Sequence, residues 1–362
     1  MSLSAHQLFD LFDEAAFAPE RWPIILDQAS AVLGASMFAL LRLRAQGGDI
    51  LAVEEKARPH AELYEPGEWW RHDLRALRSR TAPRMALMSD DDLLAPGERQ
   101  SSEFYRGFAA AVDAPYSLFW SFDVGERFFL FTALRGAAQG PATAAERRLM
   151  SEIRAKATQA AIVSAHLEEA REQGLIASLE SAGMAALALD RDGAVVGATK
   201  AGQALLAAEF TQVNGALSLK ESAGGPAFGA LERLKADLKS SGPTTQQGAF
   251  AIDRPDKAPL LCTPLHHKTP THQALSEVRT LLILKDLAAP AAVSGDVLTR
   301  LYRLTPAEAD VARQIAAGLS VEEISRARGV AEVTTRTILR AVFRKTGACR
   351  QGELAAMLNR LV

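Results

Sequence analysis

The C-terminal residues 304–362 carry the strongest local structural signals in the chain. Thr305, Pro306 and Glu308 have the spacing of a capping box, with proline at the first helical position. Ser320 and Glu323 repeat this capping box further along. Glycines suited to the left-handed conformation that ends a helix follow these boxes, at Gly318, Gly329 and Gly347. The segment therefore predicts four short helices, of which the third spans 333–346 and the last carries Leu354 and Leu358.

The third of these helices is expected to be basic on one side. Residues 299–362 contain eleven lysines and arginines and six acids, a net charge of +5, whereas the whole chain has a net charge of −2. Arg336, Arg340 and Arg344 recur every four residues and so share one helix face. Two helices joined by a tight turn, the second one basic, are typical of a helix-turn-helix that reads DNA. The apolar side chains are expected to form its core, with Val333, Ile338 and Val342 packing on Val311, Ile315 and Ile324.

This segment resembles the LuxR-type helix-turn-helix of bacterial transcription factors. The matching stretches are LTPAE, AAGLS, Glu323-Ile324, Gly329-Val330, Thr334 and VFRKTG. The resemblance implies that the third helix lies in the major groove and that Arg336, Thr337 and Arg340 read bases, since arginine suits guanine and a threonine methyl group suits thymine. It also implies phosphate contacts nearby. The full predicted DNA-binding set is Thr334, Thr335, Arg336, Thr337, Arg340, Arg344, Lys345 and Arg350.

Several positions depart from the family pattern. Ala331 stands where a serine usually caps the recognition helix, so this cap is expected to be missing. Thr335 replaces a usual valine, Ser325 a usual alanine and Arg328 a usual leucine. Ile338 replaces a usual histidine. These differences concern individual contacts and leave the resemblance of the whole module intact.

Length and composition indicate a multidomain α+β protein. The 362 residues predict two or three domains, and 48% hydrophobic with 23% charged residues is ordinary for a globular chain. No apolar run approaches the ~20 residues that span a bilayer, and the N-terminal sequence lacks a basic secretory n-region. Cys262 and Cys349 lie in different predicted domains, so neither a disulfide nor a metal site is expected. These features predict a cytoplasmic protein with no cofactor and no membrane contact.

The first predicted domain, residues 1–165, combines helices with an antiparallel sheet. Helical patterns at 4–16, 22–33, 66–78 and 101–111 surround strand-like runs at 36–44, 116–123 and 127–134, of which the last two read as a hairpin. The segments SEFYRGF and YEPGEWWRHD resemble GAF-like sensor domains attached to LuxR-type regulators. An aromatic-lined pocket for a small molecule is one interpretation of this domain, and a plain aromatic core is the other. The predicted pocket residues are Tyr64, Trp69, Trp70, Phe104, Tyr105, Tyr116 and Trp120, together with Phe119.

The second predicted domain, residues 166–287, contains a signalling helix and a further antiparallel sheet. Its ALDRDGAVVGAT opening, two helices at 199–208 and 226–239, and strands near 247–252, 258–265 and 278–286 resemble a PAS-like fold. His266 and His267 are expected to lie in a turn without binding metal. Residues 288–297, rich in small side chains, predict a linker to the helix-turn-helix domain at 298–362.

The long stretch 143–181 predicts one helix, or two interrupted near Gly174, that begins with another capping box. Its apolar residues, which include Leu149, Ile153 and Leu167, predict a homodimer seam, and packing within a single domain is the alternative. A ligand-binding or partner-binding signal would then change the spacing of two recognition helices.

No motif for catalysis is present. The chain lacks a phosphate-binding glycine loop, GxSxG, HExxH and CxxC, and Asp90-Asp91-Asp92 reads as a surface acidic turn. The sequence therefore predicts a dimeric transcriptional regulator that binds double-stranded DNA and a small molecule, with RNA polymerase as a further candidate partner. Two alternatives stay open: an acyl-homoserine-lactone receptor of the same family, and a regulator that responds to a protein partner without a ligand.

Overall fold

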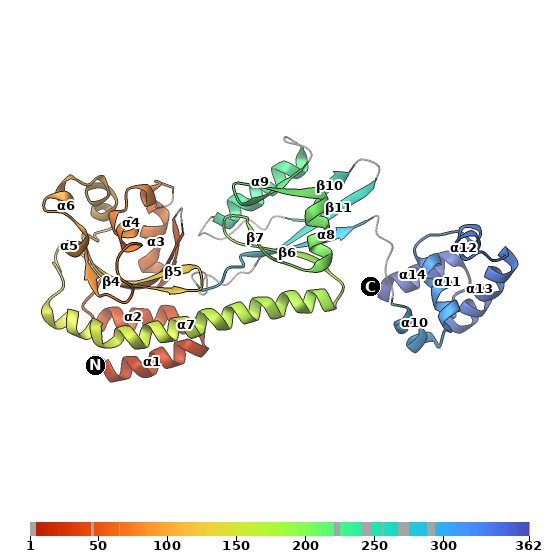
Figure 1. Cartoon of the computed structure of the whole chain (residues 1–362), viewed down its shortest axis with the longest axis horizontal. Helices are drawn as coiled ribbons and strands as arrows, with labels where there is room; N and C mark the ends of the chain where they lie inside the picture. The colour runs from red at the N-terminus through yellow and green to blue at the C-terminus, as the bar shows by residue number, and fades with distance from the viewer. Residues whose placement is uncertain are drawn as a thin grey trace. The chain divides into compact units, whose positions relative to one another are not determined.

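The chain folds as an α+β protein with antiparallel sheets and a helical C-terminal region (Figure 1). The computed structural model describes residues 5–44, 47–64, 66–220, 225–239, 248–254, 257–266, 275–287 and 294–361. Two compact units are present. One comprises Met1–Phe250 and Cys262–Leu284, and the other comprises Ala251–Leu261 and Lys285–Val362.

The first sheet has the strand order β2-β1-β5-β4-β3, and all of its strand pairs are antiparallel. The three predicted strands are confirmed as β1 (Met37–Leu43), β4 (Tyr116–Val124) and β5 (Arg127–Arg135), and β4 and β5 form the predicted hairpin. Sequence analysis missed the two edge strands, β2 (Gly48–Leu51) and β3 (Met88–Ser89). Both are too short to show an alternating pattern.

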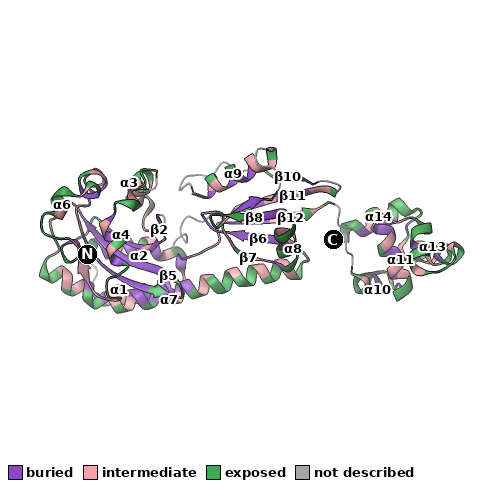
Figure 2. Ribbon diagram, turned by 45° about the horizontal axis from the view of Figure 1, so that its top comes forward, coloured by how far each residue is buried: buried purple, intermediate pink, exposed green. Residues whose placement is uncertain are grey.

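Helix α2 (Trp22–Val32) and the first half of α7 (Ala144–Ser181) pack on one face of this sheet, and α1 (Ala5–Phe17) packs on both helices (Figure 1). Their shared core is aromatic and fully buried, as Figure 2 shows for the strands. Trp22 donates its indole hydrogen to Ser164 at 3.0 Å, and Trp120 donates to Thr158 at 2.8 Å. Both indoles therefore link other elements to α7, and each keeps its polar atom satisfied inside the core.

Short helical segments cover the opposite face. They are α3 (Glu54–Tyr64), η2 (Trp69–Arg71), α4 (Leu74–Ser79), α5 (Asp90–Leu93), α6 (Glu98–Ser101) and the π-helical turn η3 (Tyr105–Ala109). The helix predicted over 66–78 is thus two shorter pieces, and the one predicted over 101–111 contains the π-helical turn. Trp69 lies directly over Gly107 in that turn, where a side chain would collide with the indole ring.

Helix α7 is a single helix of 38 residues and contains Gly174 without interruption. Its capping box forms as predicted, because Thr143 and Glu146 bond each other's backbone amides. Ile153 is fully buried and belongs to the core of its own domain. The predicted dimer seam is therefore wrong at this residue, since α1, α2 and the sheet already cover it.

The second sheet has the order β10-β11-β12-β6-β7. Its strands are β6 (Ala185–Leu189), β7 (Val195–Ala198), β10 (Phe250–Arg254), β11 (Lys257–His266) and β12 (Thr280–Asp286). Helix α8 (Lys200–Glu209) packs on β6, where Gly202 approaches the carbonyl of Ala186 too closely for any side chain. Helix α9 (Pro226–Lys239) and the two-stranded pair β8 (Phe210–Val213) and β9 (Ala216–Leu219) complete this part, and only the pair was missed by sequence analysis.

The C-terminal region is all helical. It consists of α10 (Gly295–Tyr302), α11 (Pro306–Ala316), α12 (Val321–Arg328), α13 (Glu332–Thr346), α14 (Gln351–Leu358) and the short η5 (Asn359–Leu361). The first of these was not predicted, and it takes up the last three residues of the expected linker 288–297. Leu298, Val311, Ile324, Val342 and Leu354 are buried together, so all five α-helices share one core.

Candidate DNA-binding face and ligand pocket

The predicted helix boundaries of the C-terminal region are set by the capping groups. Thr305 and Glu308 form a reciprocal capping box at the start of α11, and Ser320 and Glu323 form another at the start of α12. Left-handed glycines follow α11, α12 and α13, with φ of 87° at Gly318, 64° at Gly329 and 80° at Gly347. Ala331 supplies no side-chain cap to α13, as expected. The turn between α12 and α13 is short, so the two helices are held at a fixed angle by their shared core.

Most of the predicted DNA-binding side chains lie on exposed positions of α13 or just beyond it. These are Thr334, Arg336, Thr337, Arg340, Arg344 and Arg350. Arg336 donates to Glu332 across one helical turn, with 2.6 Å between its guanidinium nitrogen and the carboxylate. Because both side chains are exposed, this ion pair is weak and can open when a phosphate or a base edge is offered.

Thr335 is the exception within the predicted set, because it is fully buried. Its hydroxyl lies 2.8 Å from the hydroxyl of Ser325. Because Ser325 donates its one hydrogen to the carbonyl of Val321, the Thr335 hydroxyl donates to Ser325. Thr335 therefore joins α12 to α13 and is not available to DNA. Two departures from the family pattern, at 325 and 335, are thus one feature, a buried polar pair where an apolar pair is usual.

Val333 was expected in the core but is 72% exposed. It lies on the same face of α13 as Arg336, Thr337 and Arg340, since these positions follow it by three, four and seven residues. The other two predicted contacts hold, because Val342 is fully buried and Ile338 packs at the edge of the core. Sequence analysis placed Val333 by its hydrophobicity alone, although helical spacing from Arg336 indicates the exposed face.

Two basic residues of this region are engaged within the protein. Lys345 donates to Glu308 at 2.6 Å and to the carbonyl of Arg303 at 3.1 Å. The hydrogen bond from Lys345 is the main cause that lowers the pKa of Glu308. Arg328 contacts Asp310 at 2.5 Å, so the usual leucine is replaced by an ion pair between α12 and α11. Lys345 thus stabilises the start of α11 in addition to its predicted phosphate contact.

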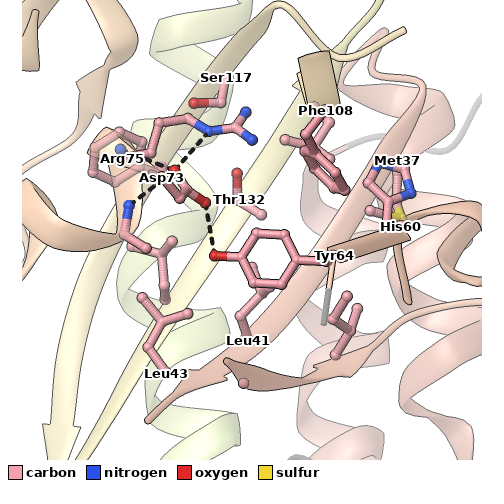
Figure 3. A pocket seen from close by; sticks show the side chains of 16 residues that line it. Met37, Leu41, Leu43, His60, Tyr64, Asp73, Arg75, Phe108, Ser117 and Thr132 are labelled. Carbon is pink, nitrogen blue, oxygen red and sulfur yellow. Dashed lines mark hydrogen bonds and ion pairs between the residues drawn. The ribbon is translucent and has the colours of Figure 1, made fainter. Parts of the chain in front are cut away.

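A cavity of about 80 Å³ lies between the first sheet and the short helices above it (Figure 3). Its floor consists of alternate residues of β1, β2, β4 and β5, and its cover comes from α3, α4 and η3. The apolar walls include Met37, Leu41, Leu43, Ile50, Phe119 and Leu130. The polar side chains that reach it are His60, Tyr64, Asp73, Arg75, Ser117 and Thr132.

Asp73 organises the polar end of this cavity. Its carboxylate caps α4 by accepting from the amides of Arg75 and Ala76 at 3.0 and 3.2 Å, and it accepts from the Tyr64 hydroxyl at 3.0 Å. The guanidinium of Arg75 lies 3.5 Å away and is buried. Burial disfavours the charge on Arg75, but Asp73 and Asp90 outweigh this effect and raise its pKa. Figure 3 shows Asp73 and Arg75 on one side of the Tyr64 ring, with His60 and Phe108 on the other.

The aromatic residues predicted for the pocket divide between several locations. Tyr64 lines the cavity, and so does Phe119. Trp120 lies on the opposite face of the sheet, in the core with Phe38 and Phe131. Three more form a group beside the cavity, in which Phe104 and Tyr105 are buried and Trp69 packs on Phe108. Trp70 and Tyr116 are partly exposed and lie under the guanidinium groups of Arg71 and Arg99.

The acidic run at 90–92 is not simply a surface turn, because Asp90 is 1% exposed. Asp90 accepts from the Tyr105 hydroxyl at 2.6 Å and from the amide of Ser117. Burial is the main cause that raises the pKa of Tyr105, and Asp90 adds to it. Asp91 and Asp92 are the exposed members of the run. The buried carboxylate fixes the π-helical turn and strand β4 beside the cavity.

A second buried carboxylate, Asp49 on β2, links this domain to residues of the second sheet and its loops. Asp49 is 3% exposed and contacts Arg279 at 2.7 Å, Arg44 at 3.1 Å and Arg191 at 3.3 Å. Burial opposes its ionisation, but these guanidinium groups, with Arg279 first, hold its pKa below the usual value. Arg44 also contacts Asp190 at 2.9 Å, and Arg191 donates to the carbonyl of Gly48 at 2.7 Å. No local sequence signal identifies this cluster, because its members are far apart in the chain.

Cys262 is buried, which raises the pKa of its thiol to about 12, and Cys349 is exposed. His267 lies outside the described residues. Within the ranges that the structure describes, no group of three metal-binding side chains occurs. In the same ranges, no helix is long and apolar enough to cross a membrane.

Comparisons with known proteins give only weak similarity. No protein-family model and no curated protein matches the sequence. Among solved structures, the VqsR LBD domain from Pseudomonas aeruginosa is similar over 45% of this chain and 97% of its own length, with 16% identity and a TM-score of 0.36. The phage VqmA-DPO complex is similar over 52% of this chain and 86% of its own, with 17% identity and a TM-score of 0.22. The function proposed next rests on the residues of this chain.

Proposed function

We propose that this chain is a DNA-binding transcriptional regulator of the LuxR type, whose helix α13 reads operator DNA under the control of a ligand pocket in its first, GAF-like domain. The observation that carries this proposal is the exposed basic face of α13, formed by Arg336, Arg340 and Arg344. The buried side of α13 packs on α11 and α12 in the shared core, which fixes the orientation of this face. An α-helix of this kind fits the major groove, and arginine pairs with guanine there.

The proposal includes a homodimer. One such module reads only a half-site, and operators with two-fold symmetry call for two recognition helices. The second half of α7, beyond the buried residues that end at Ala165, is the part of this helix that its own domain leaves largely exposed. It is therefore the part of α7 that can meet a second copy, in place of the seam first predicted around Ile153.

Strand β2 offers a route from the pocket to the rest of the protein. Gly48 and Ile50 line the cavity, whereas Asp49 between them points to the other face of the sheet, as side chains alternate along a strand. Asp49 and the carbonyl of Gly48 are bonded to Arg279 and Arg191 of the PAS-like domain. A ligand that shifts β2 would therefore act on that domain directly, and through it on DNA binding.

Selection of bound sequences from a random DNA library by the full chain tests the DNA-binding part. Arg340→Ala should relax the base preference at one position of each half-site and weaken the selected site by ~1–3 kcal/mol. Arg313→Ala is the matched control, because Arg313 is an exposed arginine that belongs to α11 and lies beside Gly295. Recovery of no preferred sequence, or an equal effect of both variants, would refute the proposed reading helix.

A further inference from the structure

The pocket holds two buried polar atoms that have no hydrogen-bond partner among the described residues. One is the Oγ atom of Ser117, a side chain that is 4% exposed, and the other is the Nε2 atom of His60. Both residues line the same cavity, and no other cavity residue is left with such an atom in the part of the chain that the structure describes. Buried polar groups are nearly always hydrogen-bonded, so an unpaired pair facing one cavity indicates a missing ligand.

His60 can be assigned a definite role. Its Nδ1 atom lies 3.1 Å from the carbonyl oxygen of Lys56, which can only accept, so Nδ1 carries the hydrogen. Burial lowers the pKa of the imidazole, and the nearby charge of Arg75 lowers it further, although the bond to Lys56 works in the opposite direction. The neutral ring therefore presents Nε2 as a hydrogen-bond acceptor, and its partner must be a donor.

The charged groups of the cavity are already satisfied by one another. Asp73 accepts from Tyr64 and from two backbone amides and contacts Arg75, while Arg75 also donates to the carbonyl of Ala114. A charged ligand would bring an additional buried charge that no side chain of the cavity is left to neutralise. The electrostatics therefore favour an uncharged ligand.

The size of the cavity sets a second limit. An apolar protein cavity of roughly 150 Å³ holds benzene, which has six non-hydrogen atoms, so a cavity of about half that volume encloses roughly three, and a ligand of five or six such atoms reaches into its opening. The cavity volume is about 80 Å³, and Leu41, Leu43 and Phe119 make most of its wall apolar. An acyl-homoserine lactone, with its ring, amide and acyl chain, exceeds this volume.

From these four observations we infer that the pocket binds a compact, uncharged molecule that carries a hydroxyl or N–H group on a small apolar body, with that donor on His60 Nε2 and a further hydrogen bond to Ser117 Oγ. This inference rests on the proposed function, because it names the class of ligand for the proposed sensor pocket. His60 and Ser117 are then the residues that determine which ligand the pocket accepts.

Three probes of matched size test the inference on the full chain. They are 2-butanol, which can donate, 2-butanone, which can only accept, and butanoate, which is charged. Binding is measured by ligand-observed nuclear magnetic resonance. The expected order of affinity is 2-butanol, then 2-butanone, with no binding of butanoate. His60→Phe keeps an aromatic ring but removes the acceptor, so it should weaken 2-butanol at least tenfold and leave 2-butanone unchanged, whereas Ser117→Ala should weaken both.

His72→Phe is the matched control, because His72 is exposed, belongs to the same domain and does not line the cavity. Equal affinities of 2-butanol and 2-butanone for the wild type would overturn the assignment of His60. Tighter binding of butanoyl-homoserine lactone than of the small probes would overturn the size limit. Sequence-selective DNA binding is measured on the same samples. If the full chain binds DNA selectively but binds none of the probes, only this inference is refuted. If it binds the probes as expected but shows no sequence-selective DNA binding, only the proposed function is refuted.

Discussion

Replacing Asp49 by asparagine tests the buried charge cluster that joins strand β2 to Arg279 and Arg191 beside the second sheet. Asparagine keeps the size and one carbonyl oxygen but removes the charge that faces Arg279, Arg191 and Arg44. Arg44 retains Asp190, whereas Arg279 loses the carboxylate that it contacts at 2.7 Å. Removing one partner from a buried ion pair costs about 3–5 kcal/mol, because the opposite charge stays buried and unpaired. We therefore expect Asp49→Asn to lower the free energy of unfolding by about 3 kcal/mol.

Urea denaturation followed by tryptophan fluorescence measures this loss where it occurs. All four tryptophans, Trp22, Trp69, Trp70 and Trp120, lie in the first domain, so the C-terminal helices do not contribute to the signal. Asp192→Asn is the matched control, since the Asp192 side chain is 46% exposed and contacts the same Arg44 at the rim of the cluster. An exposed ion pair contributes about 0–1 kcal/mol. If the free energies of unfolding of both variants lay within about 1 kcal/mol of the wild-type value, the reasoning that the charge cluster anchors β2 would be refuted.

The effect of Asp49→Asn should also depend on pH. The folded-state pKa of Asp49 lies below its usual value, because the surrounding guanidinium groups outweigh burial. Its charge therefore contributes stability that is fully present above the unfolded-state pKa of about 3.9 and is lost as the pH falls through the folded-state value. The difference between wild type and variant should be constant from pH 7 to 5 and shrink below about pH 4. A difference that grew on acidification would contradict this assignment.

Three further predictions concern the C-terminal helices. Ser325→Ala should destabilise them by about 1–3 kcal/mol, because the buried Thr335 hydroxyl loses its hydrogen-bond partner. The double change with Thr335→Val should recover most of this loss in thermal unfolding of the full chain. Val333→Ser should leave stability nearly unchanged and lower the preference for thymine at one operator position, as measured by competition binding, since its exposed methyl groups can meet a thymine methyl. Lys345→Ala should lower the melting temperature as well as the salt dependence of DNA binding, because it removes the bond to Glu308 together with a positive charge; an unchanged melting temperature would leave only the phosphate contact.

The helix boundaries of the C-terminal region could be predicted from sequence because their signals are local. A capping box spans four residues and a left-handed glycine is one residue, so neither depends on distant parts of the fold. Thr305, Ser320 and Gly347 therefore stand where the sequence placed them. The orientation of individual side chains was less secure, since one residue changes the direction on a helix by about 100°. For this reason Thr335 was predicted to face DNA but is buried, and Val333 was predicted in the core but is exposed.

The pocket could not be predicted residue by residue because both faces of the first sheet are covered by helices. A strand buried on both faces shows a continuous apolar run instead of alternation, and β4 reads YSLFWSFDV. The sequence therefore does not tell which of two neighbouring aromatics faces which side. In the fold, Phe119 lines the cavity and Trp120 lies in the opposite core. The polar residues that define the cavity were missed for different reasons. Asp73 ends the segment YEPGEWWRHD, in which only the aromatic residues were taken as pocket candidates, and His60 belongs to no motif.

Strand β2 is the point where the pocket and the buried charge cluster depend on each other. It is an edge strand of four residues, paired only with β1, so few backbone hydrogen bonds hold it. The bonds of Asp49 to Arg279 and of the Gly48 carbonyl to Arg191 are therefore a large part of its anchoring. A ligand that binds tenfold more tightly to one position of β2 shifts its equilibrium by about 1.4 kcal/mol. This shift is well below the loss of about 3 kcal/mol expected for Asp49→Asn, so a ligand can change the position of β2 while the charge cluster stays intact. In the Asp49→Asn variant, by contrast, a ligand in the pocket should no longer change the affinity for DNA.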